Sequence, residues 1–246
     1  MKKILGFVLL LIVFMSNTTP LKAQTNSVIY DDHVQVRNVP NFTSIKVSSA
    51  IDLYLSQSNE TKVAVSASND EIRDHIITEV QGGTLIIKLG ENGSWFDWKK
   101  WGNYKTKAYV SVKDLYSIIA SGASDIHLVN TLEQPKLKLS LTGASDVKGE
   151  INVGALFLEC TGASNVELKG RAEDAVIKMT GASDAKLYNL QLKAADVSAT
   201  GACHIRMNVS EVLKVSATGA SDVDYKGNPV TKNISTSGAS NVRRRD

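Results

Sequence analysis

The residues best suited to chemistry in this sequence are acidic and recur at nearly constant spacing. A phrase close to Thr-Gly-Ala-Ser-Asp-Val occurs seven times, and Asp or Asn follows the serine in six copies. Carboxylates stacked in a row could bind Ca²⁺, which favours several oxygen ligands, or could form an acidic track for a glycan. Asp and Asn also bond to nearby backbone amides in turns, so the column is interpreted first as structural. The column consists of Asp125, Asp146, Asn165, Asp184, His204, Asp222 and Asn241.

A metal site in this column is the weaker interpretation, with Asp125 and Asp146 as its residues. Asparagine makes the same turn bonds without charge, and its alternation with aspartate relieves repulsion between neighbouring carboxylates. No cofactor is therefore expected, and calcium remains the alternative.

One copy of the phrase carries Cys203-His204 where the others have Ser-Asp or Ser-Asn. In a stack of repeats, His204 would lie between Asp184 and Asp222. An imidazole between two carboxylates could transfer protons or bind metal, which makes these three residues the weak alternative for catalysis. A lone imidazole can equally hydrogen-bond as asparagine does, and the sequence implies no Arg or Lys neighbour. No catalytic residue is therefore expected.

An aromatic segment outside the repeats, Ser94 to Tyr104, is the main candidate for ligand binding because it holds every tryptophan. Trp and Tyr offer amphipathic surface suited to sugar rings, partner proteins or lipid headgroups. The alternative is that the rings fold over an open sheet end and are buried there. The candidate residues are Trp95, Trp98, Trp101 and Tyr104.

The repeat determines the elements that must position these residues. Its glycines are 18 to 21 residues apart, and such a period is typical of a solenoid. Apolar residues stand two and four positions before each glycine with mostly polar ones between them, which is strand periodicity. A second short strand begins four positions after the glycine. The glycines at the structural corners are Gly122, Gly143, Gly162, Gly181, Gly201, Gly219 and Gly238.

Each repeat is thus predicted to be a strand, a small-residue corner, a second strand and a variable turn. Glycine accepts backbone angles that other residues avoid, and Ala and Ser fit a crowded bend. Strands at this period stack as an all-β, single-stranded parallel β-helix with rungs of about 19 residues, spaced about 4.8 Å apart. An antiparallel barrel or sandwich is the alternative, but its identical corners would fall alternately at opposite ends.

Three segments are expected along the chain. Residues 1–23 resemble a signal peptide, with a basic start, an apolar run and Ala23 before the cleavage point. Residues 24–112 hold less regular strands that begin or cap the stack, with room for a short helical turn after Asn69. Residues 113–246 form the repeat β-helix. The apolar run is too short to span a membrane, so the mature protein is expected to be exported, either periplasmic or on the cell surface.

The charge balance argues against a nucleic-acid partner, and the cysteine spacing argues against a disulfide. The chain has 28 basic and 25 acidic residues, but three lysines leave with the signal peptide. The balanced mature chain has no cationic surplus for nucleic acid. Cys160 and Cys203 would lie two rungs apart, roughly 10 Å by strand spacing, which is too far for a disulfide. Two free thiols packed in the core are expected.

Several segments together resemble the head GIN domain family. They are Phe42–Val47, Ile51–Leu55, Gly82–Leu85 and the serial Gly-Ala-Ser-Asp/Asn corners. The family comprises exported bacterial proteins described as putative autotransporter adhesins. The resemblance covers nearly all of the mature chain. It implies a β-helical, non-enzymatic protein of the periplasm or cell surface.

The expected function is that of an adhesin-like binding protein of the cell envelope that recognises glycan or another surface component without catalysis. Two alternatives stay open, namely a β-helical carbohydrate-active enzyme and a purely structural envelope protein. Pectin-degrading enzymes share the parallel β-helix, but a shared fold does not carry function. Their catalytic groups stand at irregular positions in a groove, whereas the acids here belong to the repeat.

Overall fold

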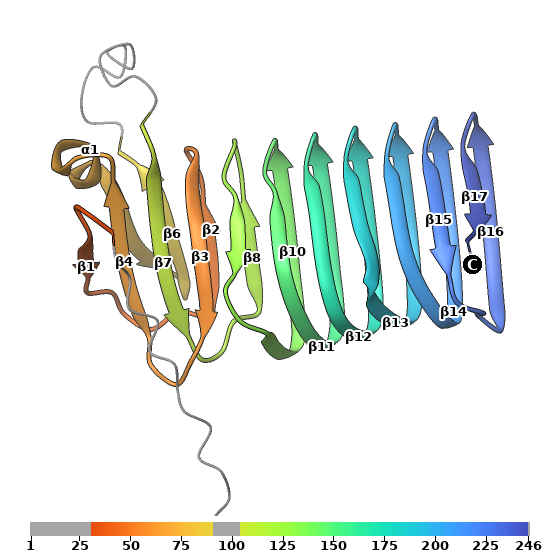
Figure 1. Ribbon diagram of the computed structural model, residues 1–246, viewed down its shortest axis with the longest axis horizontal. Helices are drawn as coiled ribbons and strands as arrows, with labels where there is room; N and C mark the ends of the chain where they lie inside the picture. Colours follow the sequence, from red (N-terminus) through yellow and green to blue (C-terminus); the bar gives the residue numbers. More distant parts are fainter. Residues whose placement is uncertain (1–30, 91–103, 246) are drawn as a thin grey trace, which may run out of the picture. The chain divides into compact units, whose positions relative to one another are not determined.

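The computed structural model describes residues 31–90 and 104–245. They form a β-solenoid of about 7 turns with a spacing of about 19 residues, which confirms the predicted fold class (Figure 1). Each regular turn contributes two strand stretches that face each other across an apolar core. A tight corner at the Gly-Ala-Ser phrase joins one stretch to the next.

Five long strands form the regular part of the stack, and each pairs in parallel with the next. Equivalent repeat positions are in register, so that Leu139 pairs with Leu158 and Leu158 with Ile177. Three shorter strands continue the stack in parallel. The strands are β10 (Leu132–Gly143), β11 (Val147–Gly162), β12 (Asn165–Gly181), β13 (Asp184–Gly201), β14 (His204–Gly219), β15 (Asp222–Lys226), β16 (Thr231–Gly238) and β17 (Asn241–Arg244).

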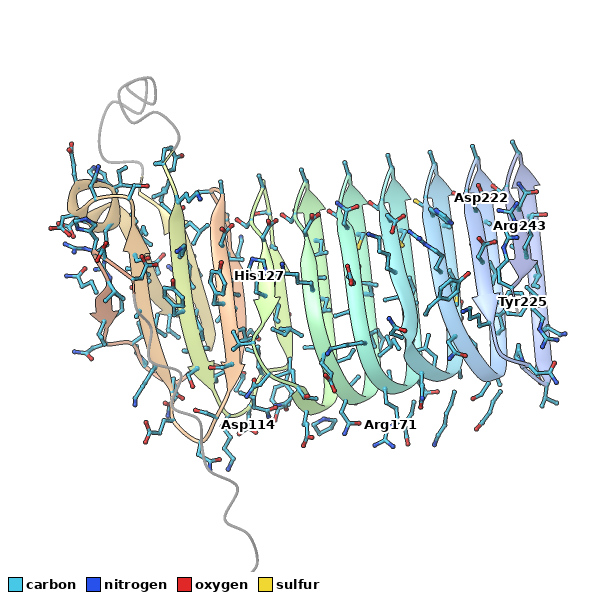
Figure 2. All side chains as sticks on the ribbon, viewed as in Figure 1. Asp114, His127, Arg171, Asp222, Tyr225 and Arg243 are labelled. Atoms are coloured by element: carbon cyan, nitrogen blue, oxygen red, sulfur yellow. The ribbon has the colours of Figure 1, made fainter. Side chains whose placement is uncertain are left out.

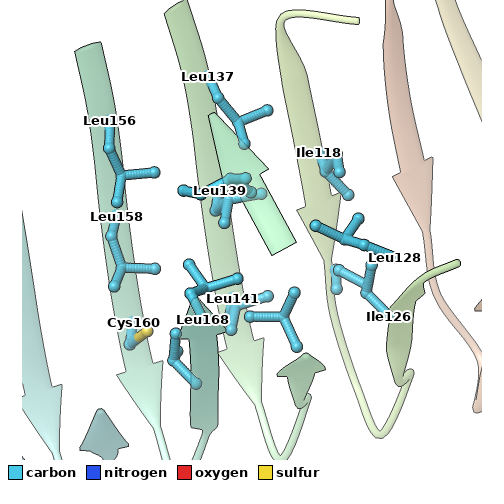
Figure 3. Close-up of a cluster of buried hydrophobic side chains, with 14 of the residues drawn as sticks. Ile118, Ile126, Leu128, Leu137, Leu139, Leu141, Leu156, Leu158, Cys160 and Leu168 are labelled. Atoms are coloured by element: carbon cyan, nitrogen blue, oxygen red, sulfur yellow. The ribbon is translucent and has the colours of Figure 1, made fainter. Parts of the chain in front are cut away.

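The core consists of columns of apolar side chains that the strand alternation turns inward (Figure 3). Leu139, Leu158 and Ile177 stand four residues before their glycines and are almost completely buried. The variable turn of the predicted repeat is absent from β11 and β12, because pairing continues through the bend, as at Asn152 and Arg171. The continuous ladder satisfies the backbone there without a separate turn.

The corners depend on glycine for two reasons. Gly162 has a φ of +114°, which side chains of L-residues disfavour. A Cβ at Gly162 would also overlap the carbonyl oxygen of Gly143 in the preceding turn. The same overlap recurs at every corner glycine from Gly143 to Gly238, so the identity of the corner residue follows from the stacking itself.

The first part of the described chain is not wound in sequence order. The strands β2 and β3 form one turn, which pairs in parallel with β6 and β7 on one side and with β8 and β9 on the other. The turn formed by the earlier residues of the chain therefore lies between two turns formed by later residues. These strands are β2 (Ser44–Val47), β3 (Ile51–Gln57), β6 (Thr84–Leu89), β7 (Thr106–Val112), β8 (Ser117–Ala120) and β9 (Ile126–Leu128).

Antiparallel strands close this end of the stack. The strand β4 (Lys62–Ala67) pairs with β7, β1 (Gln35–Arg37) pairs with β4, and β5 (Ile76–Gln81) pairs with β6. The helix α1 (Asp70–Asp74) joins β4 to β5, and the side chain of Asn69 caps it by accepting a bond from the Ile72 amide. At 5 residues, α1 is far too short to cross a membrane, and the described residues contain no helix that could.

The opposite end is more open. All eight residues of β16 are exposed, including Ile234, whose equivalents in earlier turns are core residues. Within the described residues, β16 pairs only with β14 and β17 pairs only with β15.

Candidate binding face

Two rows of polar side chains run along the outer surface of the second strand stretch, and we call them together the polar face (Figure 2). The parallel register aligns each row across the turns, and the two-residue offset between the rows turns both outward. The first row is the corner column Asp125, Asp146, Asn165, Asp184, His204, Asp222 and Asn241. The second row is His127, Lys148, Glu167, Lys186, Arg206, Asp224 and Arg243.

A groove of about 320 Å³ lies on the polar face between these rows. Carboxylate and amide groups of the first row form one side, and cationic, imidazole and carboxylate groups of the second form the other. The inward-pointing residues between the rows contribute the floor. The polar side chains that line the groove are Asp125, Asp146, Asn165, His127, Lys148, Glu167 and Lys186.

The corner acids bond to the next turn rather than to their own. Asp146 Oδ1 accepts hydrogen bonds of 2.9 Å from both the backbone amide and the side-chain amide of Asn165. The Asn241 side chain donates in the same way to Asp222, at 3.3 Å. The sequence led us to expect bonds to amides two residues further along the same chain segment. The observed direction ties one turn to the next.

His204 lies in register between Asp184 and Asp222. The two carboxylates paired with its ring, however, are those of Asp184 and Asp224. Its Nδ1 is 3.7 Å from Asp184 Oδ2, and its Nε2 is 3.7 Å from Asp224 Oδ2. Arg206 donates to both oxygens of Asp184, at 3.0 and 2.8 Å. The corner phrase itself implies no Arg or Lys neighbour, but the second row brings Arg206 alongside the column.

Asp224 is the most enclosed acid of this group, with its side chain 9% exposed. Its Oδ1 lies 3.1 Å from Arg243 Nε and 3.3 Å from Arg245 Nε. Burial acts to raise the pKa of Asp224, but hydrogen bonds from Arg245 and Arg243 outweigh it and hold the pKa below its usual range. A carboxylate bound to two guanidinium groups is a poor proton acceptor. This part of the polar face is an ion-pair network.

The second row continues into the first turns as a stack of rings. The Tyr54 ring centroid is 5.2 Å from that of Tyr109 and 4.7 Å from that of His127. Tyr109 donates a hydrogen bond of 2.7 Å to Asp31 Oδ2. Burial, followed by this bond to Asp31, raises the pKa of Tyr109 to about 12. Burial, followed by the charge of Lys148, lowers the pKa of His127.

A family model described as "Putative auto-transporter adhesin, head GIN domain" matches residues 41–229. The chain belongs to this head GIN domain family. The match confirms the resemblance seen in the sequence, and it includes the turns that line the groove. A comparison with curated proteins gives no match.

Solved structures share the fold of this head GIN domain protein. A putative adhesin from Bacteroides fragilis is 23% identical, with 86% of this chain and 96% of that chain covered and a TM-score of 0.75. A putative lipid binding protein from Parabacteroides distasonis is 17% identical, with 88% and 98% covered and a TM-score of 0.65. A putative adhesin from Parabacteroides merdae is 16% identical, with 88% and 98% covered and a TM-score of 0.64.

The aromatic candidates fall mostly outside the described part of this head GIN domain protein. Trp95, Trp98 and Trp101 lie outside the described residues, as does the predicted signal peptide. Tyr104 is described and packs, partly buried, against the hydrophobic core. Among residues 31–90 and 104–245, no group of three or more His, Cys, Asp or Glu side chains is placed to hold a metal ion.

Both cysteines are buried and free, which confirms the expectation from their spacing. Burial raises the pKa of Cys160 to about 12, so its thiol stays protonated and unreactive at neutral pH. Cys203 occupies the serine position of its corner, with its sulfur 3.5 Å from the carbonyl oxygen of Thr200. Neither thiol contributes to the polar face.

The sequence interpretation missed the second row, although the signal was present. Arg206 and Asp224 stand five residues after their corner glycines, as Lys148 and Lys186 do after theirs. Extending the column count by two positions would have located the row. The ring stack had no such signal, because Tyr54 and Tyr109 belong to turns that are stacked out of sequence order.

Proposed function

We propose that this protein is an exported, adhesin-like binding protein of the cell envelope that recognises a glycan or another surface component through the polar face. The groove between the two rows carries this proposal. It brings hydrogen-bond acceptors of the Asp and Asn side chains opposite the donors of Lys148 and Lys186. Sugar hydroxyl groups both donate and accept, so a surface that offers both in one groove suits them.

The ion pairs beside the groove favour binding over catalysis. A general acid or base needs a pKa near the working pH and a free path to the substrate. Asp184 is instead held by Arg206, and Asp224 by Arg243 and Arg245. The family and two of the solved structures reported above are called adhesins, which supports the same conclusion by name. Export is proposed from the predicted signal peptide, cleaved near Ala23.

The test is retention on a glycan array by the chain from Gln24 onward, measured with and without Ca²⁺. The variant Lys148→Ala/Lys186→Ala removes two cationic donors from the groove. Because bonds to charged groups contribute about 1.5–3 kcal/mol each, retention should fall at least tenfold. The control is Lys138→Ala/Lys178→Ala, in which two other exposed lysines are removed from the outer surface of the other strand stretch. The control should bind as the parent does.

A second variant, Trp98→Ala/Trp101→Ala, tests the aromatic segment as the binding site. Loss of retention in this variant alone would move the site away from the polar face. The parent chain is also tested for cleavage of a panel of polysaccharides. If it cleaves one, and Asp184→Asn or His204→Asn abolishes the cleavage, the protein is a carbohydrate-active enzyme instead. If the parent chain shows neither retention on the array nor cleavage of the panel, the proposal is contradicted. That result would favour a purely structural envelope protein.

A further inference from the structure

The two ends of the solenoid carry most of the exposed large apolar side chains among the described residues. Of the eight large apolar side chains exposed in the described residues, five belong to the ends. Val36 at the capped end is 72% exposed, and Ile234 at the open end is 41% exposed. The five are Val34, Val36, Ile77, Val230 and Ile234. Apolar side chains beside the last strand of a stack would lose contact with water if another strand docked there.

Both ends also present strand edges that lack a partner strand within the described residues. At the open end these are the outer edges of β16 and β17. At the capped end they are the outer edges of β1, which pairs only with β4, and β5, which pairs only with β6. A free edge exposes a row of backbone donors and acceptors that can pair with another strand.

The charges of the two ends are opposite. Residues 230–245, the last turn, contain four basic residues and no acidic one. The capped end, residues 31–37 and 70–81, contains six acidic residues against Arg37 and Arg73. Pairing within the chain offsets part of each charge, since Arg243 and Arg245 contact Asp224 and Lys107 contacts Asp31. The acidic residues are Asp31, Asp32, Asp70, Glu71, Asp74 and Glu79.

We propose that copies of this chain associate head to tail, with the open end of one copy docked on the capped end of the next. Like charges disfavour two open ends meeting, whereas opposite charges favour the head-to-tail contact. If the stack continues across the contact, β16 pairs antiparallel with β5 of the next copy, and β17 pairs parallel with β1. Such a heterologous contact does not close on itself and builds an open row of copies.

The lengths of the paired strands suit this arrangement. The strand β16 has 8 residues and β5 has 6, while β17 has 4 and β1 has 3. Ile234 and Val36 would be covered by the contact, removing apolar surface from water. The polar face lies on the side of the stack, so a row of copies leaves every groove accessible.

Sedimentation equilibrium of the chain from Gln24 onward tests the proposal across a concentration series. We expect the weight-average mass to rise beyond that of a dimer at low salt. The association should weaken at high salt because the end charges are screened. A single monomeric species at every concentration and at low salt would overturn the proposal.

Variants that block one end at a time distinguish head-to-tail association from every other kind. Ile234→Glu places an acid at the end that meets the acidic cap, and Val36→Lys places a base at the end that meets the basic turn. Each variant alone should raise the dissociation constant about tenfold or more. A mixture of the two should form a heterodimer that grows no further, because only one pair of intact ends remains.

The control variant is Phe157→Lys, which changes a side chain that is 46% exposed on a middle turn. It should associate as the parent does, and circular dichroism should show that all three variants stay folded. Dimers formed by Val36→Lys alone, with Ile234→Glu monomeric, would show tail-to-tail contact and contradict the proposal. Loss of association in Phe157→Lys would contradict it as well.

Discussion

At the scale of single residues, the buried corner serines Ser183 and Ser221 join neighbouring turns by hydrogen bonds. The serine of each intact corner up to Ser221 is at most 2% exposed. The Ser183 hydroxyl donates to the carbonyl oxygen of Gly162, at 3.2 Å, and accepts from the amide of Ser164, at 3.3 Å. Ser221 repeats this with Gly201 and Cys203. A hydroxyl that both donates and accepts joins neighbouring turns where the corner backbone leaves an amide to satisfy.

Two alanine substitutions measure this role. Ser183→Ala leaves the buried amide of Ser164 without its partner, so the free energy of unfolding should fall by about 1–3 kcal/mol. Ser164→Ala removes a buried hydroxyl that has no hydrogen-bond partner among the described residues, and the free energy of unfolding should change by no more than about 0.5 kcal/mol. Denaturant unfolding of both variants provides the comparison. Equal losses would mean that the serines act through packing alone.

At the scale of the turn, the corner glycine decides how closely two turns can stack. Gly162→Ala combines two costs, a backbone angle unsuited to alanine and a Cβ that overlaps the Gly143 carbonyl oxygen. Gly83 in the hairpin between β5 and β6 also has a positive φ, +75°, but apart from its two chain neighbours no atom of the described residues lies within 4 Å of an added Cβ. The two glycines therefore separate backbone strain from steric overlap.

We expect Gly83→Ala to lower the free energy of unfolding by about 1 kcal/mol, the cost of the backbone angle alone. Gly162→Ala should lower it by about 3 kcal/mol or more, because the carbonyl of the neighbouring turn must also move. Thermal and denaturant unfolding give both values. A loss at Gly162 no larger than that at Gly83 would show that the carbonyl of the neighbouring turn moves aside at little cost in free energy.

The regular turns could be predicted from the sequence because each one repeats the same short-range pattern. Apolar positions two and four before Gly143, Gly162 and Gly181 fix both the strand and its inward side. The groove could be predicted only in part, since the first row lies in the repeated phrase and the second was overlooked. The order of the first turns could not be predicted, because Ser44 pairs with both Thr84 and Ser117. Such long-range pairings leave no local periodicity.

At the scale of the molecule, the stack has an interlocked part and a modular part. The turn of β2 and β3 contacts the turns before and after it in the stack, and both are made later in the chain. From β10 onward, each turn of the described residues pairs its strands only with the turns next to it in sequence. Stability in such an array is close to a sum of single turns and their interfaces.

Deletion of whole turns tests this division. Removal of residues 165–183 rejoins Ser164 to Asp184, restores a Gly-Ala-Ser-Asp corner and takes out one turn. The shortened chain should fold with β-type circular dichroism and unfold cooperatively at somewhat lower stability. Removal of residues 44–57 should abolish folding, because the turns on either side lose the strands that join them. If neither shortened chain folded, the conclusion that the turns from β10 onward are modular would be contradicted.

The winding order also limits how this protein can vary in size. The turns that include residues 44–128 form a fixed base, because none of them can be lost without separating its neighbours. Beyond that base, each gained or lost repeat changes the reach of the stack by one strand spacing, about 4.8 Å. The same repeat adds or removes one side chain in each row of the polar face. The length of the stack and the number of side-chain positions offered to a ligand therefore change together, by a fixed step for each repeat.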